Sequence, residues 1–192
     1  VVNVDLFYFF NHNLQHPFLN MVMPHLTHAG GFIWMCVIVI AIIAYAKYKN
    51  KATLKKVAIL ALIALLFSDL IVYCLKHLVN EPRPFMTLDN VNLLISEDDP
   101  FSFPSGHTTS TFAVISIFVL NMKDLVKRHY NLVNFALIIF AVLIPFTRMY
   151  VGVHYPGDVI TGVIIGISGG LVVNHYKNEI FNILEHVKLI RR

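Results

Sequence analysis

The amino-acid sequence predicts an all-α integral membrane protein, in which N-terminal interfacial helices precede a bundle of five transmembrane helices. The chain has 192 residues, of which 57% are hydrophobic, and its mean hydropathy is +0.67. This composition is too apolar for a soluble domain of this size. A helix needs ~20 apolar residues to cross ~30 Å of hydrocarbon. The runs that approach this length cover residues 31–46, 54–75, 108–122, 131–147 and 158–175.

Residues 1–30 precede these runs, and we expect them to form two short amphipathic helices that lie in the membrane interface. Pro17 and Pro24 interrupt the apolar pattern, and VDLFYFF is followed by the polar stretch NHNLQH. The alternative is a sixth, broken span. The segment contains no Lys or Arg, which argues against the positive n-region of a signal peptide.

The five runs suggest how the bundle is built. Runs 31–46 and 108–122 are short, so each is expected to be extended by a polar turn or to tilt little. In the last run Gly162, Gly166 and Gly170 recur every four residues. This spacing leaves one smooth face for close helix contact.

We expect a single membrane-embedded domain over residues 1–192. Its predicted parts are an interfacial segment at 1–30, a helix bundle at 31–175 and a cytoplasmic amphipathic tail at 176–192.

The basic residues predict the orientation, because Lys and Arg in short loops favour the cytoplasm. Segment 47–56 holds five Lys, and segment 121–130 holds three basic residues. The tail adds Lys177, Lys188, Arg191 and Arg192. With five spans, twelve of the fifteen Lys and Arg fall on one side. We therefore expect a multi-pass protein of the cell membrane with a cytoplasmic C-terminus.

Three cations depart from this rule, since the same count places Lys76, Arg83 and Arg148 at the extracytoplasmic face among acidic residues. Selected cations in an acidic surround indicate a specific anion site. Nucleic acid is not expected as a partner, because no basic stripe with interleaved aromatic residues occurs. Topology accounts for the net charge of +4.

Three stretches carry the candidate site: KHLVNEPRP at 76–84, PSGH at 104–107 and RMYVGVHYPGD at 148–158. Each lies at the extracytoplasmic end of a predicted span. The first closes the second span, the next opens the third, and the last joins the fourth to the fifth. We therefore expect these helix ends to converge on one shallow pocket.

The residue types in these stretches suit a tetrahedral dianion. Lys76 supplies a point charge, and Arg83 and Arg148 supply planar forks that match phosphate oxygens. Ser105 and Gly106 precede a helix, whose free N–H groups and positive dipole end favour an anion. The sequence therefore predicts a phosphate cradle.

Two histidines are candidates for proton transfer and attack. Asp158 follows His154 by four residues, so its carboxylate is expected to reach the imidazole and fix its tautomer. This is the arrangement of an activated nucleophile with an orienting acid. His107, on the other side of the cradle, is then placed to protonate a leaving oxygen.

Three motifs together resemble a known signature. The first is Lys76 followed after six residues by Arg83-Pro84, and the second is PSGH. The third is Arg148 followed after five residues by His154 and after three more by Asp158. The signature is that of the type-2 phosphatidic acid phosphatase superfamily of membrane lipid phosphatases. The N-terminal segment resembles undecaprenyl-diphosphate phosphatases of the bacitracin-resistance type.

The resemblance implies a role for each matching residue. His154 attacks phosphorus to give a phosphohistidine, Asp158 orients it, and His107 protonates the leaving group. The phosphoryl oxygens would be held by Lys76, Arg83, Ser105, Gly106 and Arg148. One departure is visible, since Thr147 stands before Arg148 where the family usually has Ser.

The resemblance also implies hydrolysis of a lipid phosphate at the extracytoplasmic face without a metal or other cofactor. His12 and His16 have i, i+4 spacing, but no Glu or Cys accompanies them as a further metal ligand. The alternatives are a lipid phosphotransferase using the same site and, fitting less well, a transporter. A vanadate-dependent haloperoxidase has a similar cradle, but the hydrophobicity of this chain favours a lipid substrate. Undecaprenyl diphosphate, phosphatidylglycerophosphate and phosphatidate stay open as that substrate.

One further charge, Asp69, falls within the second span. Acids inside a membrane usually face the bundle interior. We expect Asp69 either to support Lys76 or another inner polar group, or to be protonated.

Overall fold

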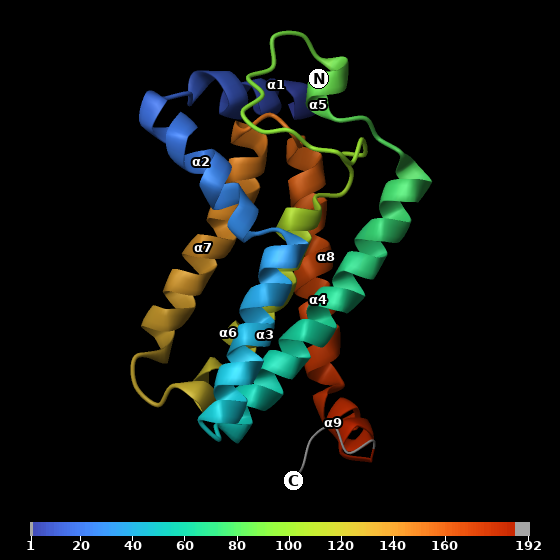
Figure 1. Ribbon diagram of the computed structural model, residues 1–192. Coiled ribbons are helices and arrows are strands. Elements are labelled where there is room, and N and C mark those ends of the chain that lie inside the picture. Colours follow the sequence, from blue (N-terminus) through green and yellow to red (C-terminus); the bar gives the residue numbers. More distant parts are fainter. Residues whose placement is uncertain (1, 187–192) are drawn as a thin grey trace.

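A computed structural model describes residues 2–186 of the chain, which form a bundle of long helices with shorter elements across one end (Figure 1). The elements are α1 Val2–Tyr8, the π-helical turn η1 Phe9–Asn13, α2 Pro17–Ala29, α3 Phe32–Tyr48, α4 Ala52–Val79, α5 Pro84–Thr87, α6 Gly106–Leu125, α7 Tyr130–Tyr150, α8 Pro156–His175 and α9 Lys177–His186. No strand occurs among these residues. The predicted cations Lys188, Arg191 and Arg192 lie outside them.

All five predicted runs coincide with helices, namely α3, α4, α6, α7 and α8. The protein is therefore an all-α membrane bundle. Of the described helices, α4, α7 and α8 are long and apolar enough to span a membrane, and α2 with α3 forms a fourth candidate that is bent by 60°. In α6 the buried polar run 108–111 faces the other helices. The count of five spans stays a prediction.

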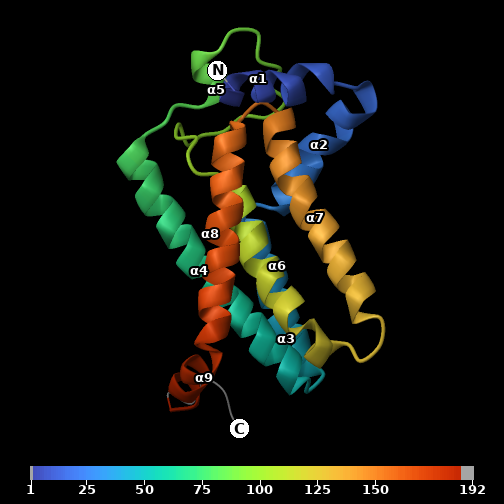
Figure 2. The ribbon, with the colours of Figure 1, turned by 180° about the vertical axis from the view of Figure 1, so that it is seen from behind.

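α6 occupies the centre of the bundle, where it contacts α3, α4, α7 and α8 (Figures 1 and 2). The glycines of α8 allow its close approach. A Cβ at Gly162 would lie 2.8 Å from the Ser105 carbonyl oxygen, and one at Gly166 would lie 2.6 Å from the Thr109 carbonyl oxygen. The predicted smooth glycine face is confirmed as the contact between α6 and α8.

In the N-terminal segment, α1 and η1 lie across the end of the bundle where α7 ends and α8 begins, and α2 runs from there along α7 to the start of α3 (Figure 1). The anchor of the segment is the buried Asn11, whose amide donates to the carbonyls of Asn92 at 3.0 Å and Tyr150 at 2.9 Å. The segment contains three elements where two short helices were predicted. The third, α2, begins at Pro17 directly after its N-cap, His16.

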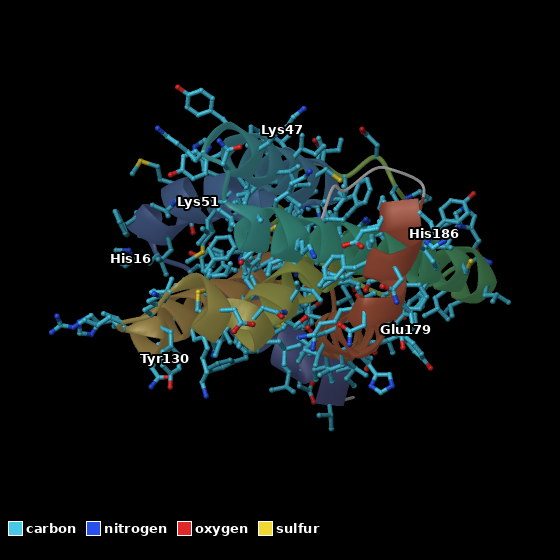
Figure 3. The ribbon with its side chains drawn as sticks, turned by 90° about the horizontal axis from the view of Figure 1, so that it is seen from below. His16, Lys47, Lys51, Tyr130, Glu179 and His186 are labelled. Carbon is cyan, nitrogen blue, oxygen red and sulfur yellow. The ribbon has the colours of Figure 1, made fainter. Side chains whose placement is uncertain are left out.

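The opposite end carries the α3–α4 and α6–α7 connections and α9 (Figure 2). Seen from below in Figure 3, Lys47 and Lys51 lie at this end. The Lys49 ammonium lies 5.0 Å from the ring centroid of Tyr48, and that of Lys51 lies 5.3 Å from the ring centroid of Tyr45. We call this the basic end and the other the site end.

Candidate active site

The structure brings the eight predicted site residues to the site end. Lys76 lies in the last turn of α4, Arg83 precedes α5, and Arg148 lies in the last turn of α7. The others are at the starts of α6 and α8: Ser105, Gly106, His107, His154 and Asp158. Each position follows from local sequence, since α4 ends at a left-handed Asn80 and Pro84 and Pro156 begin α5 and α8.

His154 and Asp158 form a buried pair, each only 1% exposed. The His154 Nδ1 atom lies 3.2 Å from Asp158 Oδ2. The same carboxylate accepts the Tyr155 N–H at 2.8 Å and so caps α8. Ser102 donates its hydroxyl to Asp158 Oδ2, with its Oγ 3.4 Å from His154 Nδ1. Asp158 is thus held in place from the helix and from the loop before α6.

Arg83 fixes the tautomer of His154. Its Nη1 lies 3.3 Å from His154 Nε2 and donates to the Val153 carbonyl at 3.0 Å. A guanidinium has only donors, so Nε2 presents its lone pair and the ring proton lies on Nδ1, toward Asp158. Burial, followed by the positive charges of Arg148 and Arg83, holds the pKa of His154 well below its usual range. The imidazole is therefore neutral.

Arg148 is fully buried, with its three nitrogens in different situations. Nη1 donates to Thr27 Oγ1 at 2.9 Å, and Nη2 pairs with Glu97 Oε1. Nε has no hydrogen-bond partner among residues 2–186. A buried donor without an acceptor costs about 1–3 kcal/mol. Arg148 thus keeps one buried donor that the described residues leave without an acceptor.

Two carboxylates from the loop before α6 form ion pairs with the cations of the site. Glu97 Oε2 is 3.6 Å from Arg83 Nη2, and Asp99 Oδ2 is 3.7 Å from the same atom and 2.8 Å from Lys76 Nζ. Burial raises the pKa of Asp99, but hydrogen bonds from Lys76 and the Phe101 amide outweigh it, so the net pKa lies below the usual value. Asp99 is therefore an anion held by cations.

The start of α6 places His107 and Ser105 differently. A Cβ at Gly31 would lie 3.0 Å from His107 Nε2, so this ring rests against the break between α2 and α3. Ser105 caps α6 by accepting the Thr108 N–H at 3.5 Å, and its hydroxyl also accepts from Thr108 Oγ1 at 3.0 Å. Its amide donates to the Asp158 carbonyl at 3.1 Å, which joins the starts of α6 and α8. Phosphate binding by Ser105 stays a prediction.

Sequence reasoning missed Ser102 and Thr27, and it counted Glu97 and Asp99 only among the acids of that face. No motif spacing marks them, because all four act through contacts across the chain. The Thr147 hydroxyl donates to the Ile144 carbonyl at 2.6 Å, within its own helix. Asp69 accepts from Ser110 Oγ at 2.9 Å, which makes it the partner of an inner polar group.

The N-terminal histidines have structural partners. His16 Nδ1 accepts the Phe18 N–H at 3.2 Å as the N-cap of α2, and His12 Nε2 lies 2.6 Å from the Asn90 carbonyl oxygen. Within the described ranges, no group of three or more His, Cys, Asp or Glu is placed to hold a metal ion.

A membrane bundle that gathers three cations around a neutral histidine at one end has the form of an enzyme acting on phosphate groups. The chain belongs to the PAP2 superfamily, whose model matches residues 55–181. The predicted resemblance to the type-2 phosphatidic acid phosphatases is thereby confirmed.

Relatives cover most of the chain. It is 32% identical over 165 residues to an undecaprenyl-diphosphatase of Sulfolobus acidocaldarius, covering 85% of this chain and 73% of the relative. It is 27% identical over 170 residues to phosphatidylglycerophosphatase B of Bacillus subtilis, covering 87% and 79%. The crystal structure of Aquifex aeolicus LpxE matches with a TM-score of 0.73 at 29% identity, covering 92% of this chain and 96% of that one.

Proposed function

We propose that this membrane lipid phosphatase cleaves a phosphate from the head group of an isoprenyl diphosphate or a phospholipid phosphate, through a phosphohistidine on His154 and without a metal. One observation carries the proposal. The guanidinium of Arg83 touches both His154 Nε2, at 3.3 Å, and the anions Glu97 and Asp99, at 3.6 and 3.7 Å. An anion bound by Arg83 therefore lies beside the lone pair of a neutral imidazole.

In the first step, His154 Nε2 attacks the phosphorus. The bond from phosphorus to the leaving oxygen breaks, and its electron pair stays on that oxygen, which takes a proton from protonated His107. Asp158 keeps the Nδ1 proton and balances the positive charge that develops on the ring. Lys76, Arg83 and Arg148 balance the charge on the phosphoryl oxygens.

In the second step, water attacks the phosphohistidine. Neutral His107 takes a proton from the water, the P–N bond breaks, and its electron pair returns to Nε2. Phosphate is released, and both histidines regain their starting states. A lipid alcohol in place of water would make the chain a phosphotransferase, and competition between the two acceptors distinguishes these outcomes.

We place the site at the extracytoplasmic face. Segments 47–56 and 121–130 at the basic end carry eight Lys and Arg, five in the first and three in the second. Because such residues favour the cytoplasm, the site end is directed outward. Its position at helix ends suits a head group better than a transported solute, whose site would lie near the midplane.

Phosphate release from a panel of lipid phosphates and diphosphates tests the proposal, using the full chain in vesicles. We expect turnover of at least one of them, and its loss in His154→Ala with substrate binding largely retained, since the cations remain. Phosphate release near the wild-type rate in that variant would contradict the mechanism.

A further inference from the structure

The two loop carboxylates mark two separate anion positions. Glu97 lies between Arg83 and Arg148, and Asp99 lies between Lys76 and Arg83. The Nη2 atom of Arg83 is nearly equidistant from them, at 3.6 and 3.7 Å. The cations thus form two adjacent subsites that share one guanidinium.

A guanidinium fork binds carboxylate and phosphate oxygens with the same geometry. Each carboxylate therefore occupies a place that suits a phosphoryl group. A monophosphate fills one such place, whereas a diphosphate has two phosphoryl groups joined by one oxygen and fills both.

We propose that the site takes a lipid diphosphate, with the terminal phosphoryl group in the Glu97 position and the lipid-linked one in the Asp99 position. This inference rests on the proposed function and narrows its substrate to one class.

Burial decides the order of the two groups. The Glu97 position is deep, since the side chains of Glu97, Arg83 and Arg148 are 18%, 2% and 0% exposed. The Asp99 side chain is 44% exposed. His154 is itself only 1% exposed, so the nucleophile lies at the depth of the buried Glu97 position. The lipid chain then leaves through the open subsite.

This arrangement gives the leaving group its own cation. As His154 Nε2 bonds to the terminal phosphorus, the bond from that phosphorus to the bridging oxygen breaks. Its electron pair passes to the oxygen of the lipid monophosphate, which takes the proton of His107, and Lys76 and Arg83 balance the remaining charge. Water then cleaves the phosphohistidine as in the proposed reaction.

The carboxylates leave when the diphosphate binds. The loop that carries them is tied at both ends, by the Leu94 N–H to the Val151 carbonyl at 3.1 Å and the Ser102 N–H to the Glu81 carbonyl at 2.7 Å. Between these ties Arg83 Nε donates to the Asp99 carbonyl at 2.6 Å, and this contact has to be released as the stretch shifts. Free phosphate displaces one carboxylate and binds in one subsite, so it binds more weakly than a diphosphate, which binds in both. Because the loop carboxylates occupy the subsites beforehand, they lower the apparent affinity for phosphate and for the diphosphate.

Binding of two probes, inorganic phosphate and pyrophosphate, tests the two subsites by calorimetry. The full chain carries His154→Gln, so that neither probe is turned over. We expect pyrophosphate to bind about tenfold more tightly than phosphate. Glu97→Gln should tighten both probes about tenfold, because it frees the deep subsite. Asp99→Asn should increase the affinity for pyrophosphate about as much but that for phosphate less, because the subsite it frees is the more exposed one.

Asp98→Asn is the matched control. Asp98 is exposed on the same loop, and its substitution removes the same charge. It should change neither affinity. The inference fails if pyrophosphate binds no better than phosphate, if Asp99→Asn tightens phosphate as much as Glu97→Gln does, or if Asp98→Asn reproduces these effects.

Two measurements on the wild-type chain avoid any effect of the variants on folding. Amide hydrogen exchange in residues 95–101 should speed up with pyrophosphate, and unchanged or slower exchange would oppose the displacement of the loop. The kcat/KM for farnesyl diphosphate should be about tenfold higher than that for farnesyl monophosphate. Equal kcat/KM values for the two farnesyl substrates overturn this inference alone. If no lipid phosphate is turned over but phosphate and pyrophosphate bind as expected, the proposed function alone is overturned.

Discussion

At the scale of single residues, the site depends on Arg83, which is 2% exposed and has Nη1 at His154 and Nη2 at the two loop carboxylates. Its Nε donates to the Asp99 carbonyl at 2.6 Å. A lysine at this position has one charged atom and cannot make these contacts together. The guanidinium thus links the proposed anion position to His154, the proposed nucleophile.

The pKa of His154 leads to a prediction for the pH profile. Attack requires neutral imidazole, and a lowered pKa keeps the ring neutral at lower pH. The acidic limb should therefore lie below about 6.5, the usual histidine value. The alkaline limb follows deprotonation of His107, and because burial and then the charge of Arg148 hold the pKa of His107 well below its usual range, this limb should also lie on the acid side of the usual histidine value. A profile of kcat/KM against pH checks this, and an acidic limb at or above the usual value would refute it.

Ser102 is predicted to position Asp158. Ser102→Ala removes the hydroxyl donated to Asp158 Oδ2 and should lower kcat about tenfold, the equivalent of roughly 1.4 kcal/mol. Vanadate affinity should stay unchanged, because the cations are intact. Ser102→Thr, which keeps a hydroxyl, should restore much of the rate. Equal losses of kcat and vanadate affinity would indicate a disrupted site instead.

How far the sequence predicts the site is clear at this scale. Motif spacing named the cations, both histidines and Asp158, because their order along helix ends determines where they meet. It assigned no role to Glu97 or Ser102, since a loop residue gains its partner only from the folded path of residues 88–104. Ser105 shows the same limit, because spacing does not reveal that its hydroxyl caps α6.

At the scale of elements, the break between α2 and α3 supports the start of α6. The 60° bend occurs at Gly30 and Gly31. A Cβ at Gly30 would lie 2.5 Å from Ile144 Cγ2, and one at Gly31 would lie 3.0 Å from His107 Nε2. The N-terminal helices thus approach the site through residues without side chains.

This contact predicts the effect of Gly31→Ala. The added methyl group should displace the His107 ring and slow turnover of substrates with a poor leaving group. p-Nitrophenyl phosphate, whose leaving group needs no proton, should be affected least. His107→Ala should show the same pattern. Equal losses for both kinds of leaving group in His107→Ala would make His107 a phosphate ligand instead of the acid.

The sequence predicted the long helices well but the N-terminal elements only in part. The length and hydropathy of their apolar runs mark α4, α7 and α8 directly. The break before α3 is harder to anticipate, since it depends on the packing of Gly30 and Gly31 against Ile144 and His107. Hydropathy also understates α6, whose buried residues include Thr109 and Ser110.

At the scale of the whole molecule, the two ends differ in charge and role. The basic end carries exposed Lys beside Tyr rings, as in Lys49 with Tyr48, a combination typical of a membrane interface. The site end carries the buried cations and histidines. The bundle therefore keeps the exposed cations of one end apart from the buried cations of the other.

The whole site is predicted to work in excess EDTA. Lys76, Arg83 and Arg148 already supply the positive charge that the transition state of phosphoryl transfer requires. Phosphate release from the best lipid substrate should be unchanged by the chelator. Loss of activity that a divalent ion restores would show that a metal shares this task.

Trapping of the phosphoryl group on His154 tests the central claim most directly. The full chain is mixed with a lipid phosphate labelled in its terminal phosphoryl group, quenched within milliseconds and mapped by mass spectrometry. We predict a label on His154 that survives alkali and is lost in acid, as a P–N bond requires, and that is absent from His154→Ala. Turnover with no label on His154, or with the label on another residue, would contradict the account.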